Sequence, residues 1–225
     1  MKPVLRVAVN PSGAYRYGAR VADTARGRPA RYTLDELLDV VVHEFNARGY
    51  DATSMEDLAR ATGLTKSSIY HHVTGKEELL RLAVARASDA LFAVLEEPGS
   101  VDGYASDRLE HVLRRSVDVL AAELPYVTLL LRVRGNTAAE RWALTRRKEF
   151  DAHLTALVQA AMDEGDVRVD LDPALITRLV FGMVNSVAEW FKPRGRNPVQ
   201  EVADTLVVLA FDGMHRREEL AAPPE

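Results

Sequence analysis

Apolar residues recur at helical spacing along most of the chain. The first series follows Thr33 and comprises Leu34, Leu37, Leu38, Val41 and Phe45. Residues three or four positions apart form one face of an α-helix, and a threonine before such a series can cap its first turn. Gly49 follows the series, as expected where a helix ends. The pattern therefore predicts a helix from about residue 33 to residue 48.

Eight further segments have the same period. They cover residues 54–62, 65–73, 76–96, 106–122, 125–135, 137–165, 172–192 and 197–214. The alternating stretch "DVRVDLD" at residues 166–172 is too short to form a stable sheet. Because the connections are short and the helical period dominates, the sequence predicts an all-α protein.

Two of these predicted helices, at residues 54–62 and 65–73, are short and separated by a turn at Gly63. The residues spaced to fix the angle between them are apolar: Leu58, Ala59, Leu64, Ile69 and Val73. Two short helices joined in this way and braced by a preceding helix form a helix-turn-helix, whose second helix enters the DNA major groove. We therefore expect an N-terminal three-helix DNA-binding domain followed by a larger helical domain.

The second helix of this motif begins with polar residues. Small hydroxyls permit close approach to base edges, a lysine supplies positive charge, and a tyrosine phenol can donate to a phosphate. The first turns of the neighbouring helices, at Thr53 or Ser54 and at Lys76, can also bind phosphate through backbone amides. The expected DNA-binding residues are Ser54, Thr65, Lys66, Ser67, Ser68, Tyr70, His71 and Lys76.

His71 and His72 are adjacent in the same segment. Neighbouring residues of a helix project about 100° apart, so they cannot face one metal ion as an i, i+4 pair can. We expect His71 to face DNA and His72 to pack at the domain junction. Glu149 and His153 do have i, i+4 spacing, but no second pair completes a site, which favours a surface hydrogen bond over a metal.

The net charge of −4 conceals an uneven distribution. Residues 1–76 contain 11 Lys and Arg against 8 Asp and Glu, whereas residues 77–225 contain 18 against 25. The basic surplus therefore coincides with the predicted DNA-binding end. Residues 1–31 lack helical periodicity and indicate a flexible basic arm. Its Arg26, Arg28 and Arg31 either reach the minor groove and flanking phosphates or form a solvated tail.

Several other classes of protein are disfavoured. The chain has no cysteine, and hence no disulfide, thiolate nucleophile or Cys-based zinc site. No apolar run approaches the ~20 residues of a membrane span, and the first residues lack a signal-peptide core, so a cytoplasmic protein is expected. The scattered acids and six histidines form no convergent catalytic group, so we expect neither an enzyme nor a bound cofactor.

The stretch "GYDATSMEDLARATGLTKSSIYHHVTGKEELL", from Gly49 to Leu80, resembles the DNA-binding motif of the tetracycline-repressor (TetR) family of bacterial transcription regulators. It has the glycine and aromatic of that motif, then "GLTKSSIYHHV" and "KEEL", with Val73 where the family usually has phenylalanine. The resemblance implies a homodimer that binds a near-palindromic operator and is released by a small-molecule effector. It assigns residues 172–191 and 198–213 to dimerisation.

These inferences predict four parts of the chain. They are a basic arm (1–31), a DNA-binding domain (32–77), an effector-binding and dimerisation domain (78–217) and a tail (218–225).

A run of basic residues in the second domain lies close to Trp142 and Phe150. It comprises Arg132, Arg134, Arg141, Arg146, Arg147 and Lys148. This run is either ordinary surface charge or part of a site for an effector with apolar and negative parts, such as an acyl-CoA. The later "SVAEWFKPRG" resembles the end of the effector domain in family members that answer to acyl-CoAs or fatty acids. The candidate effector-binding residues are Trp142, Arg146, Phe150 and Asn185.

Two alternatives to a ligand-responsive repressor stay open at this point. One is an architectural DNA-binding protein that needs no ligand and has little sequence preference. The other is an all-α enzyme.

Overall fold

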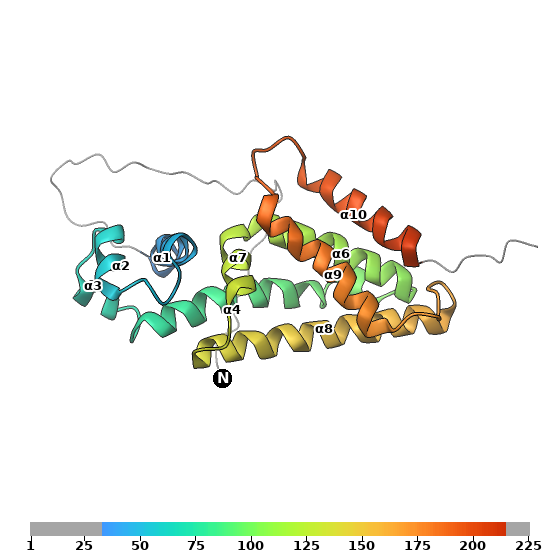
Figure 1. Ribbon diagram of the computed structural model, residues 1–225, viewed down its shortest axis with the longest axis horizontal. Helices are drawn as coiled ribbons and strands as arrows, with labels where there is room; N and C mark the ends of the chain where they lie inside the picture. The colour runs from blue at the N-terminus through green and yellow to red at the C-terminus, as the bar shows by residue number, and fades with distance from the viewer. Residues whose placement is uncertain (1–32, 215–225) are drawn as a thin grey trace, which may run out of the picture. The chain divides into compact units, whose positions relative to one another are not determined.

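The computed structural model describes residues 33–214, and within them the protein is all-α, which confirms the predicted fold class (Figure 1). The predicted arm with Arg28 and Arg31, and the tail at 218–225, lie outside the described residues. The helices are α1 (Leu34–Arg48), α2 (Met55–Thr62), α3 (Lys66–Tyr70), α4 (Lys76–Val94), α5 (Pro98–Val101), α6 (Ala105–Ala122), α7 (Leu124–Arg132), α8 (Ala138–Glu164), α9 (Pro173–Trp190) and α10 (Val199–Met214).

Local sequence signals account for where several helices begin and end. Thr33, Ser54 and Thr137 each cap a helix and form a reciprocal pair with the acidic residue three positions later. Such a pair satisfies two backbone N–H groups that the first turn leaves without partners. At the other ends, Gly63 and Gly165 adopt the left-handed conformation that terminates α2 and α8.

Helix α5 is one element that the periodicity did not predict. It spans a single turn, which is too short to repeat an apolar position. Pro98 begins the turn, and the buried hydroxyl of Ser100 donates to Val94 O at 2.6 Å. Glu97 then joins α5 to α6, because its carboxylate accepts hydrogen bonds from Arg115 at 2.9 Å and pairs with His111 at 2.7 Å.

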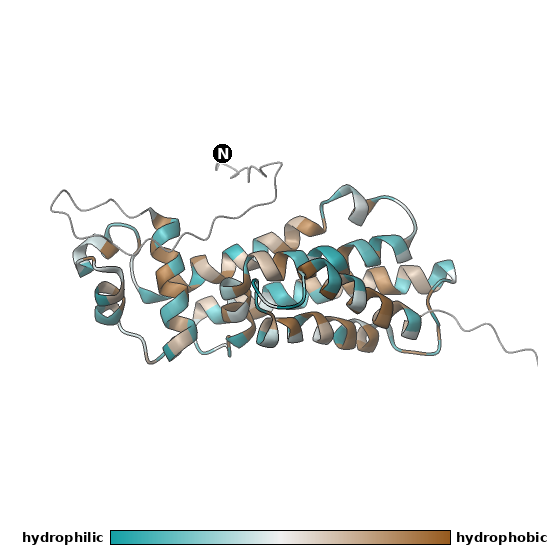
Figure 2. Cartoon of the chain, turned by 90° about the horizontal axis from the view of Figure 1, so that it is seen from above, coloured by the Kyte–Doolittle hydropathy of each residue, from teal (hydrophilic) through white to brown (hydrophobic). Residues whose placement is uncertain are grey.

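The first three helices pack around a small core. Leu37, Val41 and Phe45 of α1 are buried against Leu58 of α2 and Ile69 of α3. Figure 2 shows apolar and polar residues alternating along each helix, as expected where one face is buried and the other meets solvent. This three-helix unit fixes the position of α3.

The remaining helices surround a second part of the core. Helix α4 packs on α1 and also on α6, α7 and α8, so it crosses the boundary predicted at residue 77. Helix α8 packs along α4, α6 and α9, while α10 lies on α6 and beside α9. Within residues 33–214, no helix is long and apolar enough to cross a membrane. The division into domains at residue 77 remains a prediction.

Candidate DNA-binding surface and effector cavity

The turn between α2 and α3 is built from local backbone chemistry. Gly63 has φ +69°, a left-handed conformation that a side chain would strain. Thr65 then caps α3 by accepting from Ser68 N at 3.1 Å. Leu58 and Ile69 are both fully buried, so they hold α2 and α3 at a fixed angle. This is the arrangement that the sequence predicts for a helix-turn-helix.

The outer face of α3 is polar and accessible. Lys66, Ser67 and Tyr70 are exposed, and half of the Tyr70 surface meets solvent. Lys66 Nζ lies 3.1 Å from Glu56 Oε2 of α2, and both side chains are largely exposed. The Thr65 hydroxyl lies 2.9 Å from that of Ser68, so these two predicted DNA-binding residues are partnered with each other.

The two histidines lie beyond the end of α3. Because α3 ends at Tyr70, His71 only caps it and His72 falls in the following turn. Both are exposed, so the prediction that His72 packs at the domain junction is wrong. The helical projection used for it does not apply past Tyr70, and Val73, which is 3% exposed, takes the buried position instead.

The other predicted phosphate-binding positions have internal partners. The Ser54 hydroxyl donates to Asp57 Oδ2 at 2.6 Å, while Thr53 is buried and donates to Gly49 O at 2.7 Å. Lys76 Nζ donates to Tyr50 O at 2.9 Å and lies 4.2 Å from the centre of the Tyr50 ring. The Lys76 ammonium therefore fastens the loop before α2 rather than standing free on the surface.

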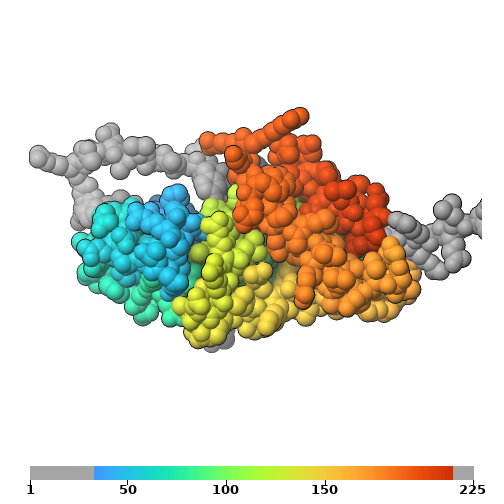
Figure 3. Space-filling view, in the orientation of Figure 1, coloured from blue at the N-terminus to red at the C-terminus, as the bar shows by residue number. Residues whose placement is uncertain are grey.

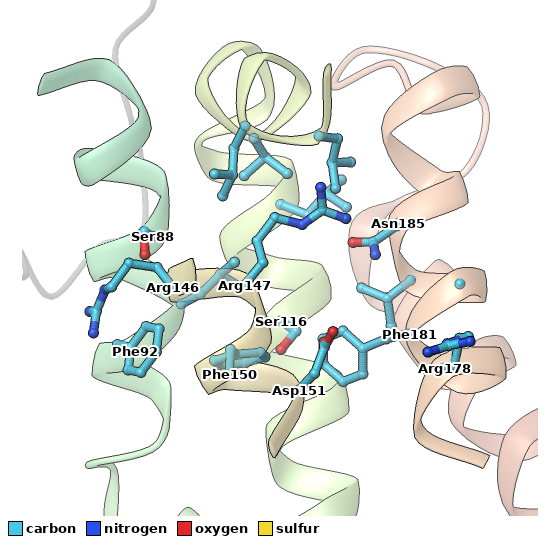
Figure 4. Close-up of a pocket in the computed structure, with 17 residues that line it drawn as sticks. Ser88, Phe92, Ser116, Arg146, Arg147, Phe150, Asp151, Arg178, Phe181 and Asn185 are labelled. Carbon is cyan, nitrogen blue, oxygen red and sulfur yellow. The ribbon is translucent and has the colours of Figure 1, made fainter. Parts of the chain in front are cut away.

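A cavity of about 340 Å³ opens among α4, α6, α7, α8 and α9 (Figure 4). Its size falls within the range of small-molecule sites. Most of its wall is apolar. The apolar side chains that line it are Leu91, Phe92, Leu120, Val127, Leu130, Leu131, Phe150, Phe181 and Val184. Phe92 and Phe181 each form a T-shaped pair with Phe150, and the ring centres are 5.5 Å apart in both pairs.

Charged groups also line the cavity. The Arg146 guanidinium already has partners within the protein, because it stacks 3.6 Å from the Phe92 ring and pairs with Asp89 and Glu149. Arg147 and Arg178 have no ion pair or hydrogen bond with another described residue. In Figure 4 the Arg147 side chain extends toward Asn185.

Asp151 is the carboxylate among these lining groups. It is partly exposed, yet desolvation of its carboxyl raises its pKa, although the positive charges of Arg147 and Arg178 oppose this. The two arginines outnumber it, so the charge around the cavity favours an anion.

Three of the four predicted effector residues line this cavity, namely Arg146, Phe150 and Asn185. Trp142 does not, because it lies one turn earlier on α8 and packs half-buried against the core. Five polar lining residues were not among the candidates, although Arg147 belongs to the basic run: Ser88, Ser116, Arg147, Asp151 and Arg178. Arg147 and Asp151 share a face at i, i+4, which is a signal that the sequence offers. The other three come from separate helices and carry no such signal.

Helix α7 connects the cavity to the predicted DNA-binding helices. Three of its residues line the cavity, and the buried Tyr126 donates from its phenol to Asp39 Oδ1 of α1 at 2.6 Å. Arg86 of α4 stacks 4.2 Å from the Tyr126 ring and pairs with Glu123 at 2.7 Å. Asn46 of α1 also donates to the backbone of α7, to Pro125 O at 2.8 Å.

The last two helices carry large apolar side chains on their outer surface. Figure 3 shows α9 and α10, coloured orange to red, at the surface of the molecule. Leu175, Leu179 and Trp190 of α9 are between 50% and 62% exposed, and Val208 and Leu209 of α10 are 54% and 65% exposed. We call these five residues the α9–α10 stripe.

The predicted Glu149 and His153 pair has separate partners. Glu149 pairs with Arg146, whereas the His153 ring meets the Phe92 ring edge-on at 6.2 Å. In residues 33–214, no group of three or more His, Cys, Asp or Glu side chains is arranged to hold a metal ion.

Two family models match the chain. Residues 37–83 match the bacterial regulatory proteins of the tetR family, and residues 102–214 match the tetracyclin repressor-like C-terminal domain. The first match contains the helix-turn-helix, and the second contains α6 to α10 with most of the cavity wall.

The chain is similar to a named transcriptional repressor and to solved structures of other regulators. The HTH-type transcriptional repressor KstR2 of Rhodococcus jostii (strain RHA1) is 28% identical over 198 residues, covering 86% of this chain and 95% of its own. The crystal structure of SCO3833, a TetR-family regulator from Streptomyces coelicolor A3, is 58% identical over 80% of this chain and 91% of its own, with a TM-score of 0.75. The structure of AibR in complex with isovaleryl coenzyme A and operator DNA has the same fold, with a TM-score of 0.70 and 24% identity over 81% of this chain and 98% of its own.

Proposed function

Because this chain belongs to the TetR family of bacterial regulatory proteins, whose members are DNA-binding regulators rather than enzymes, we propose that it is a ligand-responsive transcriptional repressor. The observation that carries the proposal is the exposed polar face of α3, held by the buried Leu58 and Ile69. A helix fixed in this way can enter the major groove and read base edges with its first residues.

The residues proposed to contact DNA are those still accessible on and around α3. Lys66, Ser67 and Tyr70 head this group, with His71 just after the helix. Ser54, Thr65, Ser68 and Lys76 remain in the proposal through their backbone amides or by exchange of their present partners. Arg28 and Arg31 remain candidates for the minor groove.

A homodimer is part of the proposal. The α9–α10 stripe supports it, because its five large apolar side chains are at least half exposed on two neighbouring helices, and a protein rarely leaves such a group in water. When two copies are related by a two-fold axis, the stripe of each copy covers the stripe of the other. A two-fold dimer would present two α3 helices to half-sites about 34 Å apart, which requires a near-palindromic operator.

The effector is proposed to bind in the cavity and to combine an apolar body with a negative group, as an acyl-CoA does. Apolar side chains make up most of the wall, while Arg147 and Arg178 are available for an anion. The isovaleryl coenzyme A in the AibR structure is consistent with this class of ligand.

Release from DNA follows from the position of α4. This helix begins directly after the helix-turn-helix, and its residues Ser88, Leu91 and Phe92 line the cavity. An effector that binds more tightly when the two α3 helices have the wrong spacing would shift the population toward the free protein. The effector must have this difference in affinity, or no release follows.

Binding to DNA tests the first part of the proposal. Operator sequences selected from a random library would be titrated by fluorescence anisotropy with wild-type protein, Lys66→Ala and Tyr70→Ala. We expect both variants to bind more weakly, because each loses one phosphate or base contact per subunit, with the dimer intact. Lys148→Ala and Tyr104→Ala change residues that are also exposed but lie far from α3 along the chain, and they serve as matched controls.

Two outcomes would contradict the proposal. If wild-type protein selects no sequence even at low salt, it is not a specific regulator. If it binds DNA with a steep salt dependence, and no acyl-CoA or other apolar anion alters that binding, the architectural alternative is favoured.

A further inference from the structure

The cavity contains a polar group that an apolar ligand would leave without a partner. Ser116 of α6 lies in its wall and is 0% exposed, and its Oγ makes no hydrogen bond within the described residues. Ser88 of α4 is a second buried hydroxyl in the same wall, with 4% of its surface exposed. A buried hydroxyl without a partner costs free energy that an alanine at the same position would not.

Ser116 shares its part of the cavity wall with apolar side chains. Leu120 follows it by one turn on α6 and lines the same cavity, and Figure 4 shows Ser116 beside Phe150. The charged lining residues belong to other helices, α8 and α9. The cavity therefore offers two kinds of polar contact: charged groups suited to an anion, and a hydroxyl within the apolar wall.

We infer that the effector carries a hydroxyl or keto oxygen part-way along its apolar body, and that Ser116 binds this oxygen while Arg147 and Arg178 attract the negative group. The inference rests on the proposed ligand-responsive function and narrows the class of its effector. A hydroxyl both donates and accepts, so either oxygen function satisfies Ser116. Because Ser116 Oγ is buried from solvent, such a hydrogen bond discriminates against a plain hydrocarbon chain.

The test compares matched ligands. Decanoate and its monohydroxy and monoketo derivatives, substituted at each chain position in turn, would be titrated calorimetrically both as free acids and as CoA thioesters. We expect at least one derivative to bind wild-type protein about 5 to 10 times more tightly than unsubstituted decanoate of the same form, as one net hydrogen bond gives. The comparison of acids with thioesters reveals whether a carboxylate or a CoA phosphate supplies the anion.

Substitution of Ser116 identifies the responsible group. Ser116→Ala is expected to abolish the preference for the oxygenated ligand and to bind decanoate as tightly as wild-type protein does. Ser186→Ala is the matched control, because Ser186 is an exposed serine on α9 whose hydroxyl donates to Met183 O within its own helix. It should retain the preference.

Three results would overturn the inference. One is that no oxygenated derivative binds more tightly than its parent, and another is that the preference survives in Ser116→Ala. The third is that none of the acids or thioesters binds. Operator binding by the same samples without ligand is a separate readout, so failure of the ligand class is distinguishable from failure of the regulator proposal.

Discussion

Replacing Tyr126 by phenylalanine tests the contact between α7 and the DNA-binding helices. The change keeps the buried ring under Arg86 and removes only the hydroxyl, which donates to Asp39 and accepts from Arg86 Nη1 at 3.2 Å. A hydrogen bond to a charged group contributes about 1.5–3 kcal/mol to stability. The Asp39 side chain is 61% exposed, so water can replace part of what it loses. We therefore expect the free energy of unfolding to fall by about 1.5 kcal/mol, at the lower end of that range.

Denaturant unfolding followed by circular dichroism measures this change. The transition midpoint should fall while its slope stays constant, because the surface exposed on unfolding is the same. Tyr104→Phe is the matched control, since Tyr104 is 69% exposed and should change stability little. If Tyr126→Phe lost no more stability than Tyr104→Phe, the phenol would not tie α7 to α1 and the reasoning would be refuted.

Three further predictions concern charge and assembly. Glu56→Gln should raise operator affinity about 2–5-fold per subunit, because it frees Lys66 from a surface ion pair; anisotropy titration giving equal or weaker binding would contradict this. Leu179→Glu should yield a monomer in sedimentation and lower operator affinity in anisotropy titration, whereas Val101→Glu, at another exposed apolar residue, should leave the dimer intact; a dimeric Leu179→Glu protein would exclude this face. Burial alone would raise the pKa of Glu97, but hydrogen bonds from Arg115 and His111 lower it overall. Its stabilising effect is present above the carboxyl's ordinary pKa near 4.5 and is lost as pH falls below that value. Glu97→Gln should therefore lose less stability than wild-type protein between pH ~6 and pH ~3, and parallel pH curves would refute this.

The sequence predicted most of the fold because its signals are local. Capping residues such as Thr33 and Thr137, and the terminating Gly165, act on backbone groups within four residues of themselves. The end of α3 was misjudged for the converse reason. The chain after Tyr70 turns so that Val73 can enter the core, and that requirement comes from helices elsewhere in the sequence.

The candidate site was less accessible to sequence reasoning than the fold. The helix-turn-helix is one continuous stretch, so its exposed residues follow from a single helical projection. The cavity takes its wall from five helices, and Ser88, Ser116 and Arg178 become neighbours of one space only when those helices pack. Arg146 lines the cavity as predicted, and nothing in the sequence indicated that its guanidinium also contacts Asp89, Glu149 and the Phe92 ring.

The pairing of α4 with α8 limits how a signal can cross the molecule. The first turns of the two helices are joined by Glu77 Oε1, which accepts from Ala139 N at 3.0 Å, and Arg146 of α8 stacks on Phe92 near the other end of α4. Helix α4 is therefore fastened to α8 near both of its own ends, so it resists bending. At 1.5 Å per residue, α4 is about 28 Å long, and a tilt of about 5° moves its far end by about 2 Å. An effector that pushes on α4 near Phe92 would therefore tilt the whole helix, and the largest displacement would occur at its first turn, which follows α3 in the chain.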